Sequence, residues 1–294
     1  MFARRPASAT LPSPAVSLAA AHYVALALIL ALYLLYGLGA YGILNDNEGL
    51  YAEGAREMLA NGAFGVPTLN GVPYLEKPPL LYWLLAAAYA LFGESQIVAR
   101  AVPVAASALL VWGTVVFVRR HAGARIAWLA GLILASSFFQ ALIFRTVLPD
   151  VLLALTFALA MFSFFEWDQH RSKGNLLAAC AWLGIAVLAK GFVAIVLAVL
   201  VIAGFAAVAK RSWQWRDLAR APGCWMLLAL AAAWPLYLAL THWEYAWFYV
   251  VNEHVLRFLG MREPHDYYTG PLYYYLPRIL VALFPWTLAR HATA

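Results

Sequence analysis

Residues 45–79 read NDNEGLYAEGAREMLANGAFGVPTLNGVPYLEKPP, and the interpretation of the whole chain depends on this stretch. It carries seven charged side chains, whereas long apolar runs lie on both sides of it. The 294-residue chain is 65% hydrophobic and only 12% charged, far outside the range of soluble globular domains. The sequence therefore predicts an all-α, multi-pass membrane protein with residues 45–79 as a polar loop on one face.

The basic residues give the chain a net charge of +6, and they lie in short clusters between the apolar runs. Such clusters are typical of the cytoplasmic ends of membrane spans, so we do not expect nucleic acid as a partner. A span needs about 20 apolar residues. The predicted spans are residues 21–44, 97–118, 126–144, 151–165, 222–240 and 271–289, together with two short spans within residues 176–209.

The segment 176–209 decides the topology. As one helix its 34 residues would be about 50 Å long, against a hydrocarbon core of about 30 Å. Two spans that turn at Lys190 also keep Lys210 and Arg211 on the cytoplasmic side. The result is eight spans with both ends cytoplasmic, in which residues 1–20 are a cytoplasmic tail and residues 21–294 a membrane catalytic domain. All acidic residues except Glu166, Asp168 and Asp217 then lie outside.

The first outer loop has a helical pattern from Glu48 to Asn61, followed by Gly62 as a stop signal. One face is apolar, and the other is charged, so we expect this helix to lie flat on the membrane. The apolar face consists of Leu50, Tyr51, Ala55, Met58 and Leu59, and the charged face of Glu53, Arg56 and Glu57. Residues 80–92 are too short to cross and are predicted to form an interfacial or re-entrant helix.

Several polar residues of the outer side admit two interpretations. Lys77, beside Glu76, is either a snorkelling anchor or a contact for a ligand headgroup. Lys190, between two short apolar halves, is more readily functional, because a buried charge in a membrane is costly. Asp150 either pairs with Arg145 or belongs to the site. His254 and Arg257 share a helical face. Residues from four outer loops are expected to meet at one membrane face.

Motifs along most of the chain resemble the GT-C glycosyltransferases that use polyprenyl-phosphate sugars. Within that class the chain is similar to the ArnT-like aminoarabinose transferases and the dolichyl-phosphate-mannose protein mannosyltransferase superfamily. The motifs are Asn47-Glu48-Gly49-Leu50-Tyr51-Ala52-Glu53, Ala55-Arg56-Glu57-Met58, Pro67-Thr68-Leu69-Asn70-Gly71, Tyr74-Leu75-Glu76-Lys77-Pro78-Pro79, Leu148-Pro149-Asp150, Leu188-Ala189-Lys190-Gly191, Glu253-His254, Arg257-Phe258, Tyr274-Tyr275-Leu276-Pro277 and Pro285-Trp286.

The resemblance implies sugar transfer from an undecaprenyl-phosphate-linked donor to a lipid (lipid A-like), glycan or protein acceptor, on the periplasmic face of a bacterial inner membrane. It assigns catalytic roles to Asp46, Glu48 and Asp150. It assigns the lipid phosphate of the donor to Arg56, Lys77, Lys190 and Arg257. Glu76 and His254 are the candidate ligands of a divalent metal ion, the one cofactor expected.

Two features depart from the family pattern. Asn47 stands where the ArnT pattern has a carboxylate, so the carboxylate has either moved one residue back to Asp46 or been lost, and aminoarabinose specificity is not implied. The family also continues through further spans, so we expect this chain to correspond to the N-terminal part and to lack activity by itself. Two other functions stay open at this point: a transporter or flippase of lipid-linked sugars that uses Lys190 on the substrate path, and a non-catalytic membrane scaffold.

Overall fold

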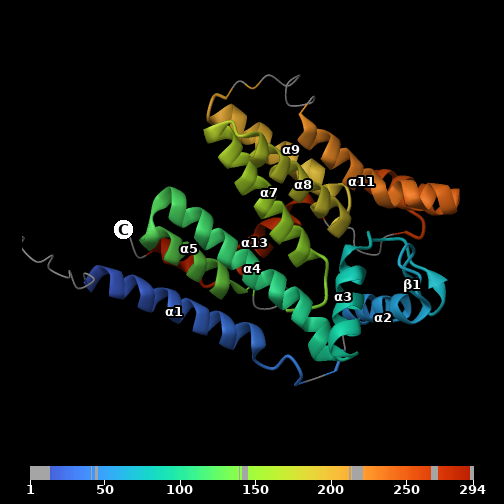
Figure 1. Cartoon of the computed structure of the whole chain (residues 1–294), viewed down its shortest axis with the longest axis horizontal. Helices are drawn as coiled ribbons and strands as arrows, with labels where there is room; N and C mark the ends of the chain where they lie inside the picture. Colours follow the sequence, from blue (N-terminus) through green and yellow to red (C-terminus); the bar gives the residue numbers. More distant parts are fainter. Residues whose placement is uncertain are drawn as a thin grey trace, which may run out of the picture.

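The structure is a computed structural model, and it describes residues 14–40, 42–43, 46–138, 140, 145–211, 213, 221–265 and 271–291. Apart from one short hairpin, the described chain is helical (Figure 1). The elements of its first half are α1 (Pro14–Leu35), α2 (Asp46–Asn61), β1 (Thr68–Leu69), β2 (Val72–Pro73), α3 (Leu80–Phe92), α4 (Gln96–Ala122) and α5 (Ala124–Ser136).

The second half follows the same pattern of helices and short connections. Its elements are α7 (Asp150–His170), α8 (Lys173–Lys190), α9 (Val193–Val208), α11 (Pro222–Thr241), α12 (Trp243–Trp247), the π-helix η1 (Phe248–Leu256), the 3₁₀ turn η2 (Leu272–Tyr274), α13 (Tyr275–Ala282) and the 3₁₀ segment η3 (Trp286–His291). Helix α7 packs along α8, and α8 packs along α11. Helix α1 lies beside α4 and α5, while α2, α3 and the hairpin gather at one end of the long helices (Figure 1).

Four helices of the described chain, α4, α7, α8 and α11, are long and apolar enough to cross a membrane. Shorter apolar helices accompany them, namely the segment Ala20–Leu32 of α1, and α3, α5 and α9. Large apolar side chains such as Leu32, Trp112 and Leu200 remain exposed on these helices, as expected for surfaces in contact with lipid. The prediction of an all-α, multi-pass membrane protein is confirmed.

The first loop forms the predicted amphipathic helix. Helix α2 ends at Asn61, and Gly62 follows it with a φ of +66°, which glycine adopts without strain. Its apolar residues Tyr51, Ala55 and Met58 are buried in the main hydrophobic core, where α3 contributes Leu81 and Leu85. The prediction that α2 lies flat against lipid is therefore wrong in one respect, because its apolar face is covered by protein. The 13 residues of α3 match the predicted short helix in both bounds.

The hairpin β1–β2 is an element that the sequence analysis did not predict. Its turn places Asn70 and Gly71 at φ values of 54° and 76°, as a type I′ turn requires. The hairpin folds back over α2, where the buried Glu57 accepts hydrogen bonds from the Thr68 hydroxyl (2.6 Å) and the Gly71 N–H (3.1 Å). Glu57 was expected to face away into water, but its carboxylate instead holds the hairpin, and the Thr68 bond lowers its pKa.

The predicted turn within residues 176–209 is confirmed. Helix α8 ends at Lys190, Gly191 has a φ of +93°, and α9 begins at Val193. The N–H of Gly191 closes α8 by donating to the Val187 carbonyl (2.7 Å). A residue with a side chain at this φ would be strained, so the glycine is what lets the chain reverse between two short apolar helices.

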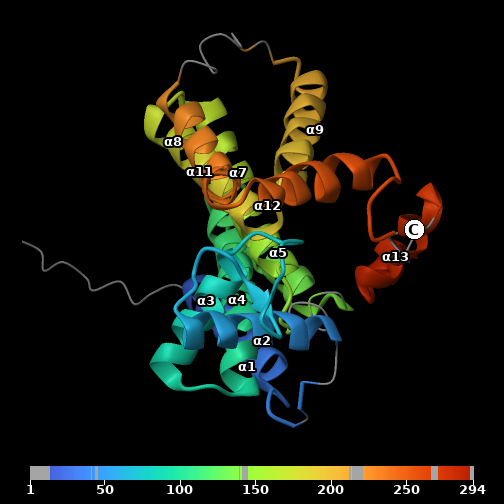
Figure 2. The ribbon, with the colours of Figure 1, turned by 90° about the vertical axis from the view of Figure 1, so that its right-hand side faces the viewer.

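The last predicted span, residues 271–289, differs from expectation. It consists of η2, the eight-residue α13 and η3. Pro285 cannot donate a backbone hydrogen bond, and every described side chain of α13 is exposed or half-buried, so little packing supports a longer helix. Figure 2 shows α13 apart from α8 and α11. The segment meets α5 through hydrogen bonds of Trp286 to Ser136 and of Phe138 to Phe284, both of 3.0 Å.

Candidate functional site

Charged side chains from distant parts of the sequence meet near the hairpin. Glu76 and Lys77 come from the loop before α3, Glu253 from η1, and Arg257 and Arg262 from the residues after η1. These five residues are called the Glu253 cluster below. Two of the outer segments that were expected to converge, the loop before α3 and the residues from η1 onward, meet in this cluster.

Glu253 is the centre of this cluster. Its side chain is only 2% exposed, yet three cations surround its carboxylate. Arg262 donates to Oε1, Arg257 donates to Oε2 at 3.1 Å, and the Lys77 Nζ lies 4.0 Å from Oε2. Removal of one cationic partner from this buried ion-pair network is destabilising, because it leaves buried charge without compensation.

Arg262 joins Glu253 to the first loop. Its Nη2 donates to Glu76 Oε1 at 2.7 Å, across 186 positions of sequence, and its side chain is only 7% exposed. The other oxygen of Glu76 accepts from the Tyr74 hydroxyl at 2.9 Å. The sequence analysis missed Arg262, because no motif marked it and its partners lie far away in the chain. Arg262 therefore holds the loop before α3 against the end of the chain segment that contains η1.

The helix that carries Glu253 is a π-helix, a rare geometry that is frequent at functional sites. Within it, Asn252 is buried and makes two hydrogen bonds to the backbone of Glu263. Its amide donates to the Glu263 carbonyl (2.6 Å), and its oxygen accepts from the Glu263 N–H (3.0 Å). These bonds fix the loop that delivers Arg262 to the cluster.

Lys77 lies among the cluster charges. Its Nζ donates to the Glu76 carbonyl at 3.1 Å and is 3.9 Å from the Glu76 carboxylate. Desolvation by burial lowers the pKa of Lys77, opposed by Glu253 and Glu76 and reinforced by Arg257 and Lys190. Lys77, Lys190 and Arg257 therefore place three positive charges around one point. A bound phosphate would offset the repulsion between them.

Asp150 and Lys190 form an ion pair between the first residue of α7 and the last residue of α8. The alternative pairing of Asp150 with Arg145 is not what the structure shows, since Arg145 donates to the Tyr36 carbonyl. Because both charges lie at helix ends and not at mid-helix, Lys190 is poorly placed for a transport path through the membrane centre. The pair borders the Glu253 cluster, because Gly191, next to Lys190, lies against the side chain of His254, next to Glu253.

His254 was a candidate metal ligand, but both of its ring nitrogens are engaged. Nδ1 lies 2.7 Å from the Tyr249 carbonyl, which requires a proton on Nδ1, and Nε2 accepts the Phe192 N–H at 3.3 Å. Burial lowers the pKa of His254, which favours this neutral form. Gly191 is in close contact as well, because a Cβ there would lie 2.5 Å from Nε2.

The described residues do not fit a metal ion at Glu76 and His254. Both oxygens of Glu76 and both nitrogens of His254 already have hydrogen-bond partners. No group of three or more His, Cys, Asp or Glu side chains suited to a metal occurs among the residues that the structure describes. A divalent metal ion stays a prediction, and it would need ligands beyond this pair.

Three other candidates do not join the cluster by any described contact. Glu48 is buried in a two-bond pair with Arg100 (2.8 and 2.9 Å) and accepts the Val147 N–H (3.3 Å), which anchors the start of α2 on α4. Arg56 is exposed and pairs with Glu53 at 2.6 Å. Asp46 is the first residue of α2, and its side chain lies outside the described residues. The catalytic role of Asp46 therefore stays a prediction.

Comparison with known proteins identifies what the chain is similar to. Residues 76–238 match the family model described as dolichyl-phosphate-mannose-protein mannosyltransferase. The chain is 32% identical over 272 residues to an undecaprenyl phosphate-alpha-4-amino-4-deoxy-L-arabinose arabinosyl transferase of Shewanella sediminis, covering 87% of this chain and 46% of the relative. A relative of the same name from Aeromonas salmonicida is 32% identical over 273 residues, covering 89% and 48%.

Solved structures agree with this result. The crystal structure of ArnT from Cupriavidus metallidurans bound to undecaprenyl phosphate superposes with a TM-score of 0.82 at 25% identity, over 95% of this chain and 50% of that one. Its apo structure gives a TM-score of 0.80 at the same identity, over 94% and 50%. The chain spans about half the length of the curated relatives it matches. With the matched residues covering more than half of the sequence, the chain belongs to the dolichyl-phosphate-mannose-protein mannosyltransferase family.

Proposed function

We propose that the protein is a membrane glycosyltransferase that takes a sugar from an undecaprenyl-phosphate-linked donor and passes it to a lipid (lipid A-like), glycan or protein acceptor. The observation that carries this proposal is the gathering of four cations and three carboxylates at one end of the spans. These are Lys77, Lys190, Arg257, Arg262, Glu76, Asp150 and Glu253. The excess of positive charge suits one phosphate group. The similarity to a structure bound to undecaprenyl phosphate supports the same ligand.

The cations divide into two roles by their exposure. Lys77, Lys190 and Arg257 are partly exposed and bind the lipid phosphate, whereas Arg262 is buried between two carboxylates and positions the others. During transfer, negative charge grows on the phosphate as the sugar leaves, and fixed cations at that point lower the barrier. An arriving phosphate also favours the protonated form of Lys77, against the desolvation that lowers its pKa.

Asp150 is the described carboxylate best placed to act on the acceptor. It is partly exposed, and its partner Lys190 belongs to the group that binds the phosphate. Once Lys190 turns to the phosphate, Asp150 is released to orient or deprotonate the acceptor hydroxyl. Asp46 is the second candidate for this role. Arg56, which faces Glu53, is not part of the phosphate site.

The orientation of the protein in the membrane is inferred from the basic residues at the opposite ends of the same helices. Arg119 and Arg120 lie in the last turn of α4, Arg171 follows α7, Lys173 begins α8, and Lys210 follows α9. By the positive-inside rule this end is cytoplasmic. The Glu253 cluster then faces the periplasm of a bacterial cell, with the protein in the inner membrane.

Donor binding tests the proposal directly. Lys77→Ala should weaken the binding of undecaprenyl phosphate to the detergent-purified chain about 10- to 150-fold, because a charge-assisted contact is worth roughly 1.5–3 kcal/mol. Lys173→Ala, at the opposite end of the spans, should leave binding unchanged. In a full-length relative, the same substitution should reduce transfer of radiolabelled sugar by at least the factor by which binding falls, because Lys77 also faces the charge that grows on the phosphate. If a well-folded Lys77→Ala protein binds the lipid as tightly as the wild type, Lys77 is a snorkelling anchor and does not bind the phosphate.

A further inference from the structure

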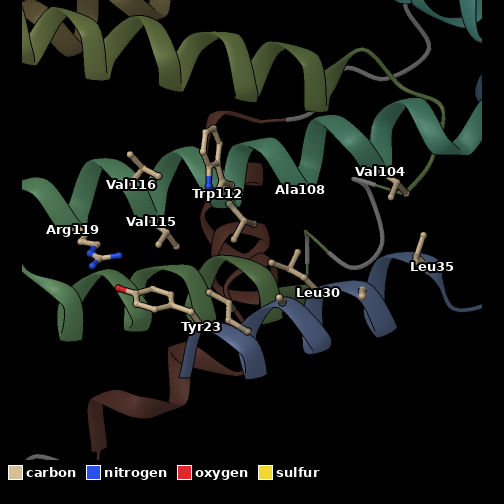
Figure 3. Close-up of a pocket in the computed structure, with 13 residues that line it drawn as sticks. Tyr23, Leu30, Leu35, Val104, Ala108, Trp112, Val115, Val116 and Arg119 are labelled. Carbon is tan, nitrogen blue, oxygen red and sulfur yellow. The ribbon is translucent and has the colours of Figure 1, made fainter. Parts of the chain in front are cut away.

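A lipid-facing groove runs between α1 and α4, and none of its lining residues belongs to the Glu253 cluster (Figure 3). Its volume is about 640 Å³, within the range of sites that bury a small ligand. Its lining is apolar apart from one end, where Tyr23 and Arg119 lie. This groove is separate from the function proposed above.

The groove is open because small side chains line it. Ala27 and Ala31 of α1 and Ala108 of α4 leave space between the helices. The helices are nonetheless held in place by close packing next to the groove, where Leu26 and Val115 fit against Gly131 of α5. A Cβ on Gly131 would lie 2.7 Å from Leu26 Cδ2 and 2.5 Å from Val115 Cγ2. The walls are therefore fixed, and the space between them suits a slender apolar molecule.

The polar end of the groove carries an uncompensated positive charge. The Arg119 guanidinium lies over the Tyr23 ring, 5.5 Å from its centroid. In the described part of the chain no carboxylate pairs with Arg119, whereas its neighbour Arg120 pairs with Glu166 at 2.9 Å. An anionic group at the mouth of the groove would complement Arg119.

Aromatic residues mark this end as the membrane–water interface. The Tyr23 hydroxyl donates to the Ala124 carbonyl (3.2 Å), and the Trp128 ring donates to the His22 carbonyl (3.0 Å). Tyrosine and tryptophan beside a basic cluster are typical of the headgroup level of a bilayer. Arg119 is therefore at the depth where lipid phosphates lie.

The length of the groove fits a lipid tail. From Val104 to Arg119 α4 rises about 22 Å, more than the roughly 15 Å depth of one leaflet of a 30 Å core. We propose that the groove binds an anionic phospholipid of the leaflet at the Arg119 end, with its phosphate on Arg119 and one acyl chain along Ala27, Ala31 and Ala108. The phospholipid would fasten α1, which otherwise packs mainly on α5, to α4.

Native mass spectrometry of the purified chain, loaded with equal amounts of phosphatidylglycerol and phosphatidylcholine, tests this proposal. The wild type should retain phosphatidylglycerol preferentially. Arg119→Gln should reduce that retention about fivefold, equivalent to about 1 kcal/mol for one cation near an anionic lipid surface. Arg125→Gln, which removes an exposed cation at the same membrane end outside the groove, should not reduce it. Ala31→Trp, which fills the groove, should reduce retention of both lipids.

Three results would overturn the proposal. Equal retention of the two phospholipids by the wild type would show that Arg119 does not select an anionic headgroup. An equal loss in Arg125→Gln would show that the cations act as a diffuse surface charge. Displacement of phosphatidylglycerol by equimolar undecaprenyl phosphate, with the same sensitivity to Ala31→Trp, would assign the groove to a polyprenyl chain.

Discussion

The two ends of the spans each hold a charged cluster, and the clusters are built differently. In the Glu253 cluster, the buried carboxylate is held by cations from separate loops, and Arg262 is itself buried. At the opposite end, Glu166 is held by Arg120, His121 and His170, and Asp168 by Arg171 and Arg211. There the arginines reach in from the surface, and two of the five partners, His170 and Arg171, are sequence neighbours at i+4 and i+3.

This difference indicates which cluster has a function beyond folding. The carboxylates at the opposite end are buried as well, but each arginine that holds them is at least 38% exposed and keeps part of its hydration. A network assembled across many positions of sequence, with a buried arginine at its centre, costs desolvation that local pairing would avoid. We therefore expect variants of the Glu253 cluster to have larger effects than matched variants of the cluster at the opposite end, here called the Glu166 cluster after its carboxylate.

The largest effect is expected for Arg262→Ala. It leaves the buried Glu253 and its partner Glu76 without their shared cation, which should cost about 3–5 kcal/mol of unfolding free energy. Arg171→Ala in the opposite cluster removes a cation that is 52% exposed and should cost less than about 1 kcal/mol. Denaturant unfolding in detergent, followed by circular dichroism, measures both. Similar losses of unfolding free energy for the two variants would mean that the buried arginine contributes no more to stability than the exposed one.

A glycine pair gives the next largest contrast. Gly191 and Gly123 have φ values of +93° and +86°, so alanine is strained at both. Of the two, the added Cβ would meet other side chains at Gly191, namely His254 and Tyr249, whereas no atom of the described residues lies within 4 Å at Gly123. Gly191→Ala should therefore cost about 1–3 kcal/mol more than Gly123→Ala in the same unfolding measurement. Equal losses of unfolding free energy would show that the His254 side chain can move aside at no cost in stability.

The smallest effect concerns pH. His254 has a lowered pKa in the folded protein, so below its ordinary value of about 6.5 the unfolded chain binds more protons than the folded one. The stability contributed by neutral His254 is present above that value and is lost as the pH falls through the folded pKa. His254→Gln should remove this component of the pH dependence. Thermal unfolding at a series of pH values compares the two proteins, and parallel pH profiles would contradict the prediction.

Local sequence patterns predicted much of the fold. The apolar runs gave α4, α7, α8 and α11, the four described helices long enough to cross a membrane, the 3.6-residue period gave α2, and the Lys190-Gly191 step gave the turn between α8 and α9. The hairpin was missed, although Asn70-Gly71 is a strong hairpin signal. The last segment was mistaken for a span, because hydropathy counts residues and takes no account of Pro285 or of missing packing partners.

The site was harder to predict because it depends on contacts between distant residues. Convergence of Glu76, Lys77, Asp150, Lys190 and Arg257 followed from topology, since all lie at one end of the spans. Side-chain direction did not follow. Arg56 and Glu48 are near in sequence to the site, but Glu53 and Arg100 engage them, and the latter pair spans 52 positions. Arg262 became evident only once Glu76 was found next to it.

A binding titration of undecaprenyl phosphate with two matched arginine variants tests whether the Glu253 cluster binds the lipid phosphate. Arg257 is 42% exposed and lies 3.1 Å from the buried Glu253, while Arg211 is 38% exposed and lies 3.0 Å from the buried Asp168. We predict that Arg257→Ala weakens binding about 10- to 150-fold and that Arg211→Ala leaves it unchanged. Equal binding by the two variants, or a larger loss in Arg211→Ala, would contradict a phosphate site at the Glu253 cluster.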